Sequence, residues 1–452
     1  MTNKVALSLI AAAAVLTSCA GPSSTERSAT PRNTGGGATP TTSAPAPVDP
    51  GGRWLGGDGD KVWDGGGAAG GATEGFAAGD TAASVPASAK AAAGAPARTT
   101  SPTLDDVVRP PTRQSGPGLR AGSVDDNAAF ADYLKYGDEF RRLGITVHDI
   151  DVSVRHVVTV VDEAGQPLLG AVVSERGQEV RTGPDGRALL FGNIGGFNVR
   201  WGDKAVTVDF AQDSGREHRV SLPVRRPEGR AKLDVLFLID TTGSMGDEID
   251  RLKDSVRSVS ERIGELHQPP QLQPDLRLGM TVYRDRSDLF VTRTFDFTGS
   301  VDVFKAALAE VRANGGGDTP EDLNAGLHQA VTSPSWRGDD AVKLVFLIAD
   351  APPHLDYQDG PDYADDVRAA ARRGIKIMPI ASSGLDDQGE YVFRQLAQIT
   401  MARFTFLTYG ADGASPGDET DHHVSDYAVL ALDDLVVRLV SDELRPVSSG
   451  GQ

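Results

Sequence analysis

The strongest pattern in the chain is the alternation of apolar runs with amphipathic stretches from Lys232 onward. Val235–Ile239 and Leu344–Ile348 are continuous apolar runs, as strands buried on both faces of a parallel sheet require. Apolar residues recur every three or four positions over 249–266, which places them on one face of a helix. The alternation predicts an α/β fold with a doubly wound, mostly parallel sheet. Further strands are expected at 276–283, 375–380 and 404–407, and further helices at 303–311, 320–331, 362–373 and 430–444.

The period changes to two in the preceding segment, 151–228. Short β-rich runs such as Val157–Val161 and Ala188–Phe191 alternate with turn signals, among them Gly183-Pro184-Asp185-Gly186. This spacing predicts a small all-β sandwich. The stretches "VVDEAGQPLLGAVV" and "RTGPDGRALL" resemble carboxypeptidase-regulatory or bacterial Ig-like modules. The resemblance implies a spacer or binding module without catalytic residues.

Residues 121–150 carry a weaker helical pattern. Ser123 with Asp126 resembles a capping box, and Phe130, Leu134 and Phe140 are placed to line one helical face. A short helix is therefore expected here, without an assigned purpose.

The pattern of residues 1–18 predicts a targeting signal at the N-terminus. Lys4 precedes the apolar run Val5–Leu16, which is shorter than the roughly 20 residues of a membrane span. Leu16-Thr17-Ser18-Cys19 then resembles the lipobox of bacterial lipoproteins, which implies lipidation of Cys19, the chain's single cysteine. The alternative is an ordinary signal peptide with an incidental cysteine. The resemblance predicts a lipid-anchored protein of the cell envelope, facing away from the cytoplasm, and an outer-membrane location in a Gram-negative host.

Composition separates the remaining segments. Residues 19–120 are rich in Gly, Pro, Ala, Ser and Thr, which predicts a disordered tether, and 446–452 a disordered tail. The formal net charge of −18 argues against nucleic acid as a partner, because its phosphates need a basic surface. The membrane is expected to be contacted through the lipid anchor only.

Candidate chemistry gathers where predicted strands end. Asp240 and Asp350 follow the two apolar runs, and Thr242, Ser244 and Thr319 supply hydroxyls on neighbouring loops. Ligands of open α/β sheets bind at the carboxyl ends of the strands. Oxygen ligands without His or Cys are what Mg²⁺, Mn²⁺ or Ca²⁺ prefer. A divalent metal site is therefore predicted at this edge.

Four segments in this order, "FLIDTTGSM", "VYRDR", "GGGDTPEDL" and "VFLIADAPPH", resemble the von Willebrand factor A family and its metal-ion-dependent adhesion site. The resemblance covers residues 231–445, which are expected to fold alone. It implies metal ligation by Asp240, Thr242, Ser244, Thr319 and Asp350. Thr242 departs from the family's serine but keeps the hydroxyl.

Each of these residues also has an ordinary structural explanation. Thr319 with Asp322 has the pattern of a capping box with Pro320 at the first helical position, and Ser244 is placed to cap the following helix. Asp240 and Asp350 are placed to accept bonds from nearby backbone amides. Together, on three loops, the residues favour the metal.

Other polar residues are assigned to the surroundings of the site. Asp285 is expected at its rim or behind its ligands, and His354 in an exposed or packing role. For His422-His423 a solvated loop is favoured over a transition-metal site.

Enzyme classes fit the sequence less well than a binding protein. A haloacid-dehalogenase-like phosphatase needs an aspartate at the position of Thr242, and the run Gly315–Gly317 is not followed by the Lys-Ser or Lys-Thr of a P-loop. The spacing around Ser244 is not that of a hydrolase elbow. The prediction is a surface-anchored adhesion or scaffold protein, not an enzyme, whose metal takes a carboxylate from a protein partner. The alternative is an enzyme or accessory subunit of a metal- or nucleotide-handling envelope complex.

Overall fold

A nine-stranded mixed sheet organises the larger part of the fold, with the strand order β1-β12-β11-β10-β13-β14-β15-β2-β16. The computed structural model describes residues 54–56, 118–211, 215–266, 273–317, 319–410 and 417–448. The five central strands are parallel, which confirms the predicted α/β class. They are β11 (Asp275–Tyr283), β10 (Lys232–Asp240), β13 (Ala341–Ala349), β14 (Ile375–Ala381) and β15 (Phe404–Thr408).

Antiparallel strands flank this parallel centre on both sides. β12 (Thr292–Thr298) pairs with β11, and the three-residue strand β1 (Trp54–Gly56) pairs with β12. On the other side, β2 (Arg120–Val124) lies between β15 and β16 (Leu430–Ala431). Neither strand was expected: β1 falls within the predicted tether, and β2 begins at the last residue of that tether and continues into the segment predicted to be helical. The rest of 19–117, the signal segment and Cys19 lie outside the described residues.

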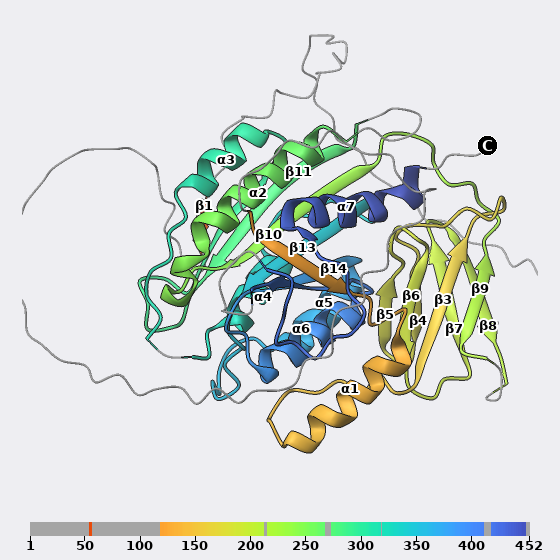
Figure 1. Ribbon diagram of the computed structural model, residues 1–452. Helices are drawn as coiled ribbons and strands as arrows, with labels where there is room; N and C mark the ends of the chain where they lie inside the picture. The colour runs from red at the N-terminus through yellow and green to blue at the C-terminus, as the bar shows by residue number, and fades with distance from the viewer. Residues whose placement is uncertain are drawn as a thin grey trace, which may run out of the picture. The chain divides into compact units, whose positions relative to one another are not determined.

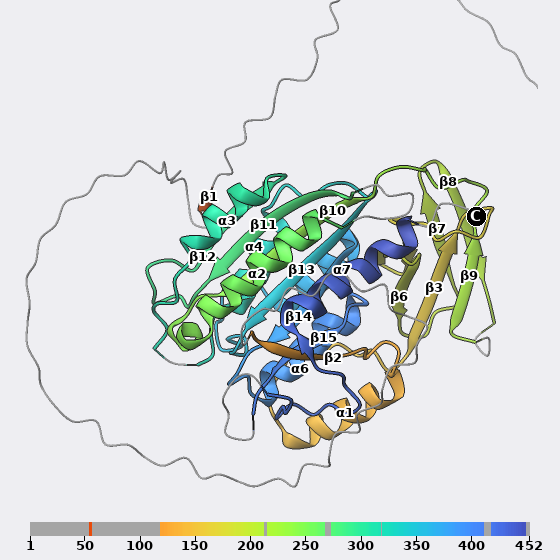
Figure 2. The same cartoon turned by 45° about the horizontal axis from the view of Figure 1, so that its top comes forward.

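Helices cover both faces of the sheet, as Figures 1 and 2 show. One group is α2 (Ile249–Gly264), which contacts α3 (Val301–Ala309) and α7 (Leu432–Ser448). The other group is α4 (Leu323–Thr332), α5 (Tyr363–Arg373) and α6 (Asp387–Ile399), packed in series. All the helices predicted for this part of the chain are present, and α6 is an additional helix that was not predicted. None of the helices in the described part of the chain is long and apolar enough to cross a membrane.

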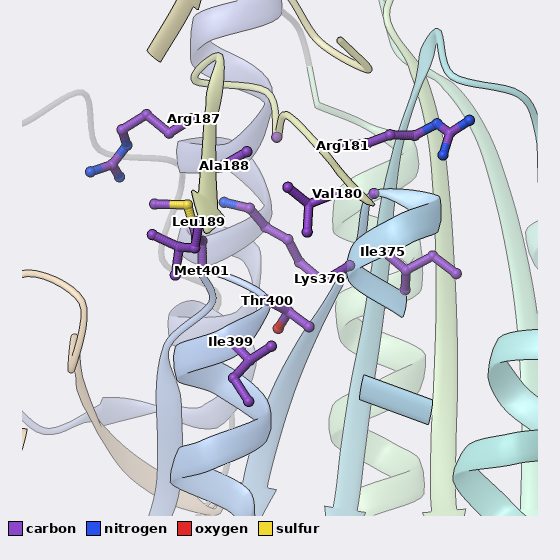
Figure 3. Close-up of a pocket in the computed structure, with 13 residues that line it drawn as sticks. Val180, Arg181, Arg187, Ala188, Leu189, Ile375, Lys376, Ile399, Thr400 and Met401 are labelled. Carbon is purple, nitrogen blue, oxygen red and sulfur yellow. The ribbon is translucent and has the colours of Figure 1, made fainter. Parts of the chain in front are cut away.

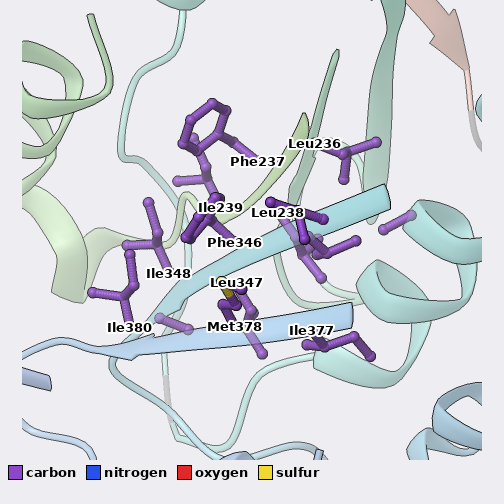
Figure 4. Packing of buried hydrophobic residues seen from close by; sticks show 14 of the residues in the cluster. Leu236, Phe237, Leu238, Ile239, Phe346, Leu347, Ile348, Ile377, Met378 and Ile380 are labelled. Atoms are coloured by element: carbon purple, nitrogen blue, oxygen red, sulfur yellow. The ribbon is translucent and has the colours of Figure 1, made fainter. Parts of the chain in front are cut away.

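The central core forms because β10 and β13 are apolar on both faces. Every position of β13 is buried, and so are all positions of β10 after Lys232. Phe237 and Phe346 are register partners with their rings 5.8 Å apart, and Figure 4 shows the neighbouring Leu and Ile side chains filling both sides of these strands. The two continuous apolar runs are confirmed as buried parallel strands.

Residues 155–221 form two further sheets with a core of their own. One turn requires glycine: Gly186 has a φ of +73°, and an added Cβ would lie 2.5 Å from the Val160 carbonyl oxygen. The strands are β3 (Arg155–Val161), β6 (Arg187–Phe191) and β9 (Glu217–Ser221) in one sheet, and β4 (Val172–Glu175), β5 (Gln178–Arg181), β7 (Gly196–Trp201) and β8 (Lys204–Asp209) in the other. A small pair of β-sheets is thus present where the sequence predicts a sandwich.

The segment before these sheets is built into the α/β domain. Leu119, Ala121 and Tyr133 lie in the same buried cluster as the central strands, and α1 (Phe130–Leu143) packs on α6. The β-sandwich is therefore an insertion between β2–α1 and β10. Residues 231–445 alone lack β2, so they do not contain the whole sheet, and their independent folding stays a prediction.

The predicted helix start at Ser123 is also wrong. Ser123 lies in β2, and the Asp125 carboxylate accepts bonds from the amides of Asn127 and Ala128, which makes a turn before α1 begins at Phe130. Asp126 binds Arg394 of α6 through both carboxylate oxygens, at 2.7 and 2.9 Å. A long-range ion pair thus takes the residue that the sequence assigned to a local cap.

Contacts between the sandwich and the α/β domain surround a small pocket, shown in Figure 3. Arg181 of β5 binds Asp339 at 2.7 Å and the backbone oxygen of Arg372. Lys376 lines the pocket and is paired with Glu443 at 2.7 Å. The pocket's buried cation therefore already has its anion within the chain.

Candidate metal centre

Asp240, the last residue of β10, is fully buried at the carboxyl end of the central sheet. Its Oδ1 accepts bonds from the Thr242 amide at 2.9 Å and the Thr242 hydroxyl at 2.7 Å. Its Oδ2 has no hydrogen-bond partner among the described residues. The turn thus supplies the backbone-amide bond that the structural explanation expected, but only to one of the two carboxylate oxygens.

The loop after β10 is joined to the glycine-rich loop of residues 315–317. The Gly243 amide donates to the Gly315 carbonyl at 2.9 Å, and the Asn314 amide donates to the Thr241 carbonyl at 3.0 Å. Gly316 has a φ of +66°, and an added Cβ there would lie 2.9 Å from Glu321 Oε1 and 3.1 Å from Thr242 Cβ. Close approach of the two loops therefore needs glycine at 316.

Ser244 links this loop to Asp350, just after β13. The Ser244 Oγ lies 3.2 Å from the Thr242 Oγ1, and its hydroxyl also bonds to the Asp350 carboxylate. Asp350 is buried, and its Oδ1 has no hydrogen-bond partner among the described residues. Ser244 does not cap α2, since the residue before that helix is Glu248 and no side chain caps it. The structure thus brings four of the five predicted ligands together.

Glu321 is a further carboxylate at this place, which the sequence did not single out. Its side chain is 2% exposed, it bonds to the Thr242 hydroxyl, and its Oε2 has no hydrogen-bond partner among the described residues. It follows Pro320 in "GGGDTPEDL", and an acidic residue at such a place is typical of the first turn of a helix. Since α4 begins only at Leu323, Glu321 lies in the loop instead.

Thr319, the fifth predicted ligand, is exposed. No side-chain hydrogen bond in the described part of the chain joins its hydroxyl to Asp240, Asp350 or Glu321. It is not a helix cap either: Asp322 precedes α4 and accepts from the Ala325 amide at 2.9 Å, so the capping box between Thr319 and Asp322 is wrong.

Negative charge is concentrated in this region. The pKa of Asp240 is raised to about 7, mainly by burial and to a smaller extent by the charge of Asp350. The pKa of Glu321 is raised to about 8, mainly by burial and to a smaller extent by the charge of Asp240. Burial also raises the pKa of Asp350. Asp240, Glu321 and Asp350 each leave one buried oxygen without a hydrogen-bond partner among the described residues, and a cation in this region would reduce the repulsion between them.

Hydroxyls are needed to complete such a site. Among the described residues, no three His, Cys, Asp or Glu side chains are grouped closely enough to hold a metal by themselves. Thr242 and Ser244 lie between the carboxylates and offer the missing oxygen atoms. The donor set fits a hard divalent cation held by both hydroxyls and carboxylates.

Asp285 and His354 lie beside these residues. Asp285 accepts a bond from the Tyr357 hydroxyl at 2.6 Å, and its charge contributes to the raised pKa of Glu321. His354 is buried, and its ring stacks on Tyr357 with centroids 4.1 Å apart. His354 therefore has the packing role that was one of its two expectations.

The His422-His423 segment is not a fully solvated loop. Nδ1 of His422 lies 3.3 Å from Glu390 Oε2 and Nδ1 of His423 lies 3.1 Å from the same atom. The His422 side chain is only 10% exposed, because the segment folds onto the buried Glu390 of α6. The expectation of a solvated loop is therefore wrong for His422, because the sequence pattern around it does not show its contact with Glu390 of α6.

Comparison with known proteins shows that residues 234–400 match the family profile of the von Willebrand factor A domain. The chain is 31% identical over 167 residues to the α-protein kinase vwkA of Dictyostelium discoideum, covering 36% of this chain and 25% of that protein. It is 28% identical over 130 residues to a putative ariadne-like RING finger protein, R811, of Acanthamoeba polyphaga mimivirus, covering 28% and 12%. The chain thus spans a quarter or less of the length of these relatives.

Solved structures of proximal thread matrix protein 1 from the mussel byssus are also similar, at 14% identity. They cover 39% of this chain and 47% of that protein, with TM-scores of 0.27 and 0.28. One of them has a zinc-occupied MIDAS motif.

Proposed function

Residues 234–400 form a von Willebrand factor A domain, and on that premise we propose that this protein binds a protein partner through a divalent cation. The observation that carries the proposal is that one buried carboxylate oxygen each of Asp240, Glu321 and Asp350 has no hydrogen-bond partner in the described part of the chain. Domains of this type commonly serve adhesion or protein binding. Mg²⁺ is the proposed ion, with Mn²⁺ or Ca²⁺ as substitutes.

The residues proposed to hold the cation are Asp240, Thr242, Ser244, Thr319 and Asp350. Asp240 is oriented by the amide and hydroxyl of Thr242, and Ser244 holds Asp350. Thr319 is included because the sequence motif resembles that of the family. It is exposed, so it would contact the cation from the solvent side. The cation would supply a positive centre that attracts a carboxylate of the partner.

Binding is favoured over catalysis by what surrounds the carboxylates. The nearby imidazole, His354, is stacked on Tyr357 and bonded to Asp356 at 2.7 Å, so it is not paired with Ser244 or Thr242 as a base with its nucleophile. An enzyme, or an accessory subunit of a metal- or nucleotide-handling envelope complex, is the competing proposal.

Partner capture by the full chain tests this function. Capture of a partner protein from an extract should be lost in EDTA and should return when Mg²⁺ or Mn²⁺ is added. Asp240→Ala, Asp350→Ala and Thr319→Ala should abolish capture while the circular dichroism spectrum is retained. The control Asp302→Ala, at an exposed position of α3, should leave capture unchanged. Undiminished capture in EDTA would refute metal dependence. Metal-dependent turnover of a substrate, lost in the same variants, would favour the enzyme.

We also propose that Cys19 is lipidated and anchors the protein to a membrane of the cell envelope, so that the domain is displayed outside the cytoplasm. The support is the sequence pattern alone, a short apolar run that ends in small residues before the thiol. Cys19→Ser should move the protein from the membrane fraction to the soluble fraction. Retention of the variant in the membrane fraction would place the anchor elsewhere.

A further inference from the structure

We propose that Asn314 is a site of spontaneous covalent modification, in which its side chain loses ammonia through a cyclic imide formed with the backbone of Gly315. Asn314-Gly315 is the single Asn-Gly pair in the sequence, and it opens the glycine-rich loop. The co-reactant is water, so the modification needs no enzyme. It also needs no bound metal, and only its consequence concerns the proposed metal site.

The reacting groups of Asn314 and Gly315 are already in contact. The Gly315 amide nitrogen lies 2.8 Å from the side-chain oxygen of Asn314 and donates a hydrogen bond to it. The first step of deamidation is attack by this nitrogen on the carbon that carries that oxygen. Because the fold holds the two groups together, the attack requires only a local movement, which favours the reaction.

The amides on either side of Gly315 are bonded to other segments of the chain. The Asn314 amide donates to the Thr241 carbonyl at 3.0 Å, and the Gly316 amide donates to the Asp288 carboxylate at 3.0 Å. Within the described part of the chain, the Gly315 amide donates to no backbone carbonyl. Its nitrogen can therefore attack without breaking a backbone hydrogen bond of the fold.

Glycine at position 315 leaves the path of attack open. A side chain on the residue after an asparagine hinders the attack, and Gly315 has none. The fold requires glycine here, because φ is +80° and an added Cβ would collide with the Asp288 carboxylate. The Asn314 side chain is exposed, so water can enter and ammonia can leave. The loop conformation thus retains a reactive pair of residues.

The reaction consists of two steps that balance. The Gly315 nitrogen bonds to the side-chain carbon of Asn314, the bond from that carbon to the side-chain nitrogen breaks, and this nitrogen leaves as ammonia with the proton of the Gly315 amide. Water then opens the imide ring at either of its two carbonyl carbons. One opening gives aspartate, and the other gives isoaspartate, whose main chain runs through the former side-chain carbon. Each product carries a carboxylate in place of the neutral amide.

The isoaspartate product alters the contact between the glycine-rich loop and the loop after β10. Two bonds hold this contact: the Asn314 amide donates to the Thr241 carbonyl, and the Gly243 amide donates to the Gly315 carbonyl at 2.9 Å. The added main-chain carbon lies between these two bonds, so both cannot keep their present geometry. The modification should therefore loosen the two loops and, on the premise of the proposed metal site, weaken cation binding.

Incubation of the full chain in mildly alkaline buffer, followed by peptide mass spectrometry, tests the proposal. Asn314 should gain about 1 Da, the difference between the ammonia lost and the water gained. The matched internal controls are Asn193 and Asn198, which are also exposed but precede Ile194 and Val199. Asn314 should react faster than either control by about tenfold or more. Asn314→Gln should remove the mass change at this position, because its longer side chain would have to form a larger ring.

Modification of Asn314 no faster than that of Asn193 and Asn198 would overturn the proposal. Modification that occurs only in urea would also overturn it, because the folded contact would then be protective. Calorimetric titration with MnCl₂ measures the consequence: the aged wild type should bind Mn²⁺ more weakly than the fresh protein, whereas aged Asn314→Gln should not change. Equal affinity of aged and fresh wild type would refute the effect on the loops. Absence of Mn²⁺ binding in the fresh protein would refute the metal site and leave the mass result standing.

Discussion

Replacing Asp126 with alanine should destabilise the α/β domain, although Asp126 lies more than 100 residues before β10 in the chain. Its carboxylate makes two bonds to Arg394, and the side chains are 4% and 5% exposed. Removing one partner of a buried ion pair typically costs about 3–5 kcal/mol, because the other charge stays buried. Arg394 keeps bonds to Glu390 at 3.2 Å and to the His423 carbonyl at 2.9 Å. The expected loss is therefore at the lower end, about 3 kcal/mol.

Urea unfolding of the full chain, followed by circular dichroism, measures this loss. The control is Asp132→Ala on the exposed side of α1, which should change the free energy of unfolding by less than about 0.5 kcal/mol. A second variant, Asp126→Ala with Arg394→Met, should recover part of the stability, since it removes the stranded charge. A loss below about 1 kcal/mol in Asp126→Ala would refute the reasoning, because Arg394 would then not depend on Asp126.

Three further predictions concern the core, the loops and the boundaries. Burial lowers the pKa of Lys343 to about 8, so the unfolded chain holds this proton more strongly from about pH 8 to 10 and the stability contribution of Lys343 rises over that range. Urea unfolding should show a larger gain from pH 7 to pH 9 in the wild type than in Lys343→Met, and equal gains would contradict it. Gly316→Ala should lower stability by about 1–2 kcal/mol and weaken Mn²⁺ binding, because its Cβ would collide with Glu321 and Thr242; calorimetry showing wild-type affinity would count against it. A fragment of residues 231–452 should aggregate or bind a hydrophobic dye, while 118–452 should fold, and a sharp, dye-free unfolding transition of the shorter fragment would show that β2 is dispensable.

The fold could be predicted where one residue pattern decides the structure locally. The runs of β10 and β13 are apolar at nearly every position, which only a doubly covered strand explains. Helix α6 was missed for the opposite reason. Its buried residues include the polar Glu390, Arg394 and Gln398 beside the apolar ones, so the buried positions and the apolar positions of this helix do not coincide. Two of these polar side chains have partners from distant segments: Asp126 binds Arg394, and the His422-His423 segment binds Glu390.

The residues of the candidate metal site were predictable to a similar extent. Asp240, Thr242, Ser244 and Asp350 are brought together by strand ends, which the sequence indicates through its apolar runs. Glu321 was not identified, because its place depends on where α4 begins. The helix starts at Leu323, three residues later than expected, and this places Glu321 in the loop. Boundaries of this kind are set by tertiary contacts such as the bonds of Glu321 to Pro352 and His354.

The pairing of β2 with β15 also sets an order of events during synthesis. Val124 pairs with Phe404, so the early strand meets its partner only after the sandwich and four of the five parallel strands have been made. The strands of the inserted sandwich pair only with one another and enclose a separate core, so the sandwich is able to fold first. Until Thr408 emerges, both edges of β2 lack the strands β15 and β16, and its buried residue Ala121 lacks its cover. Completion of the large sheet is thus a late event that depends on nearly the whole chain, and a translation pause or truncation before β15 would expose this strand to aggregation.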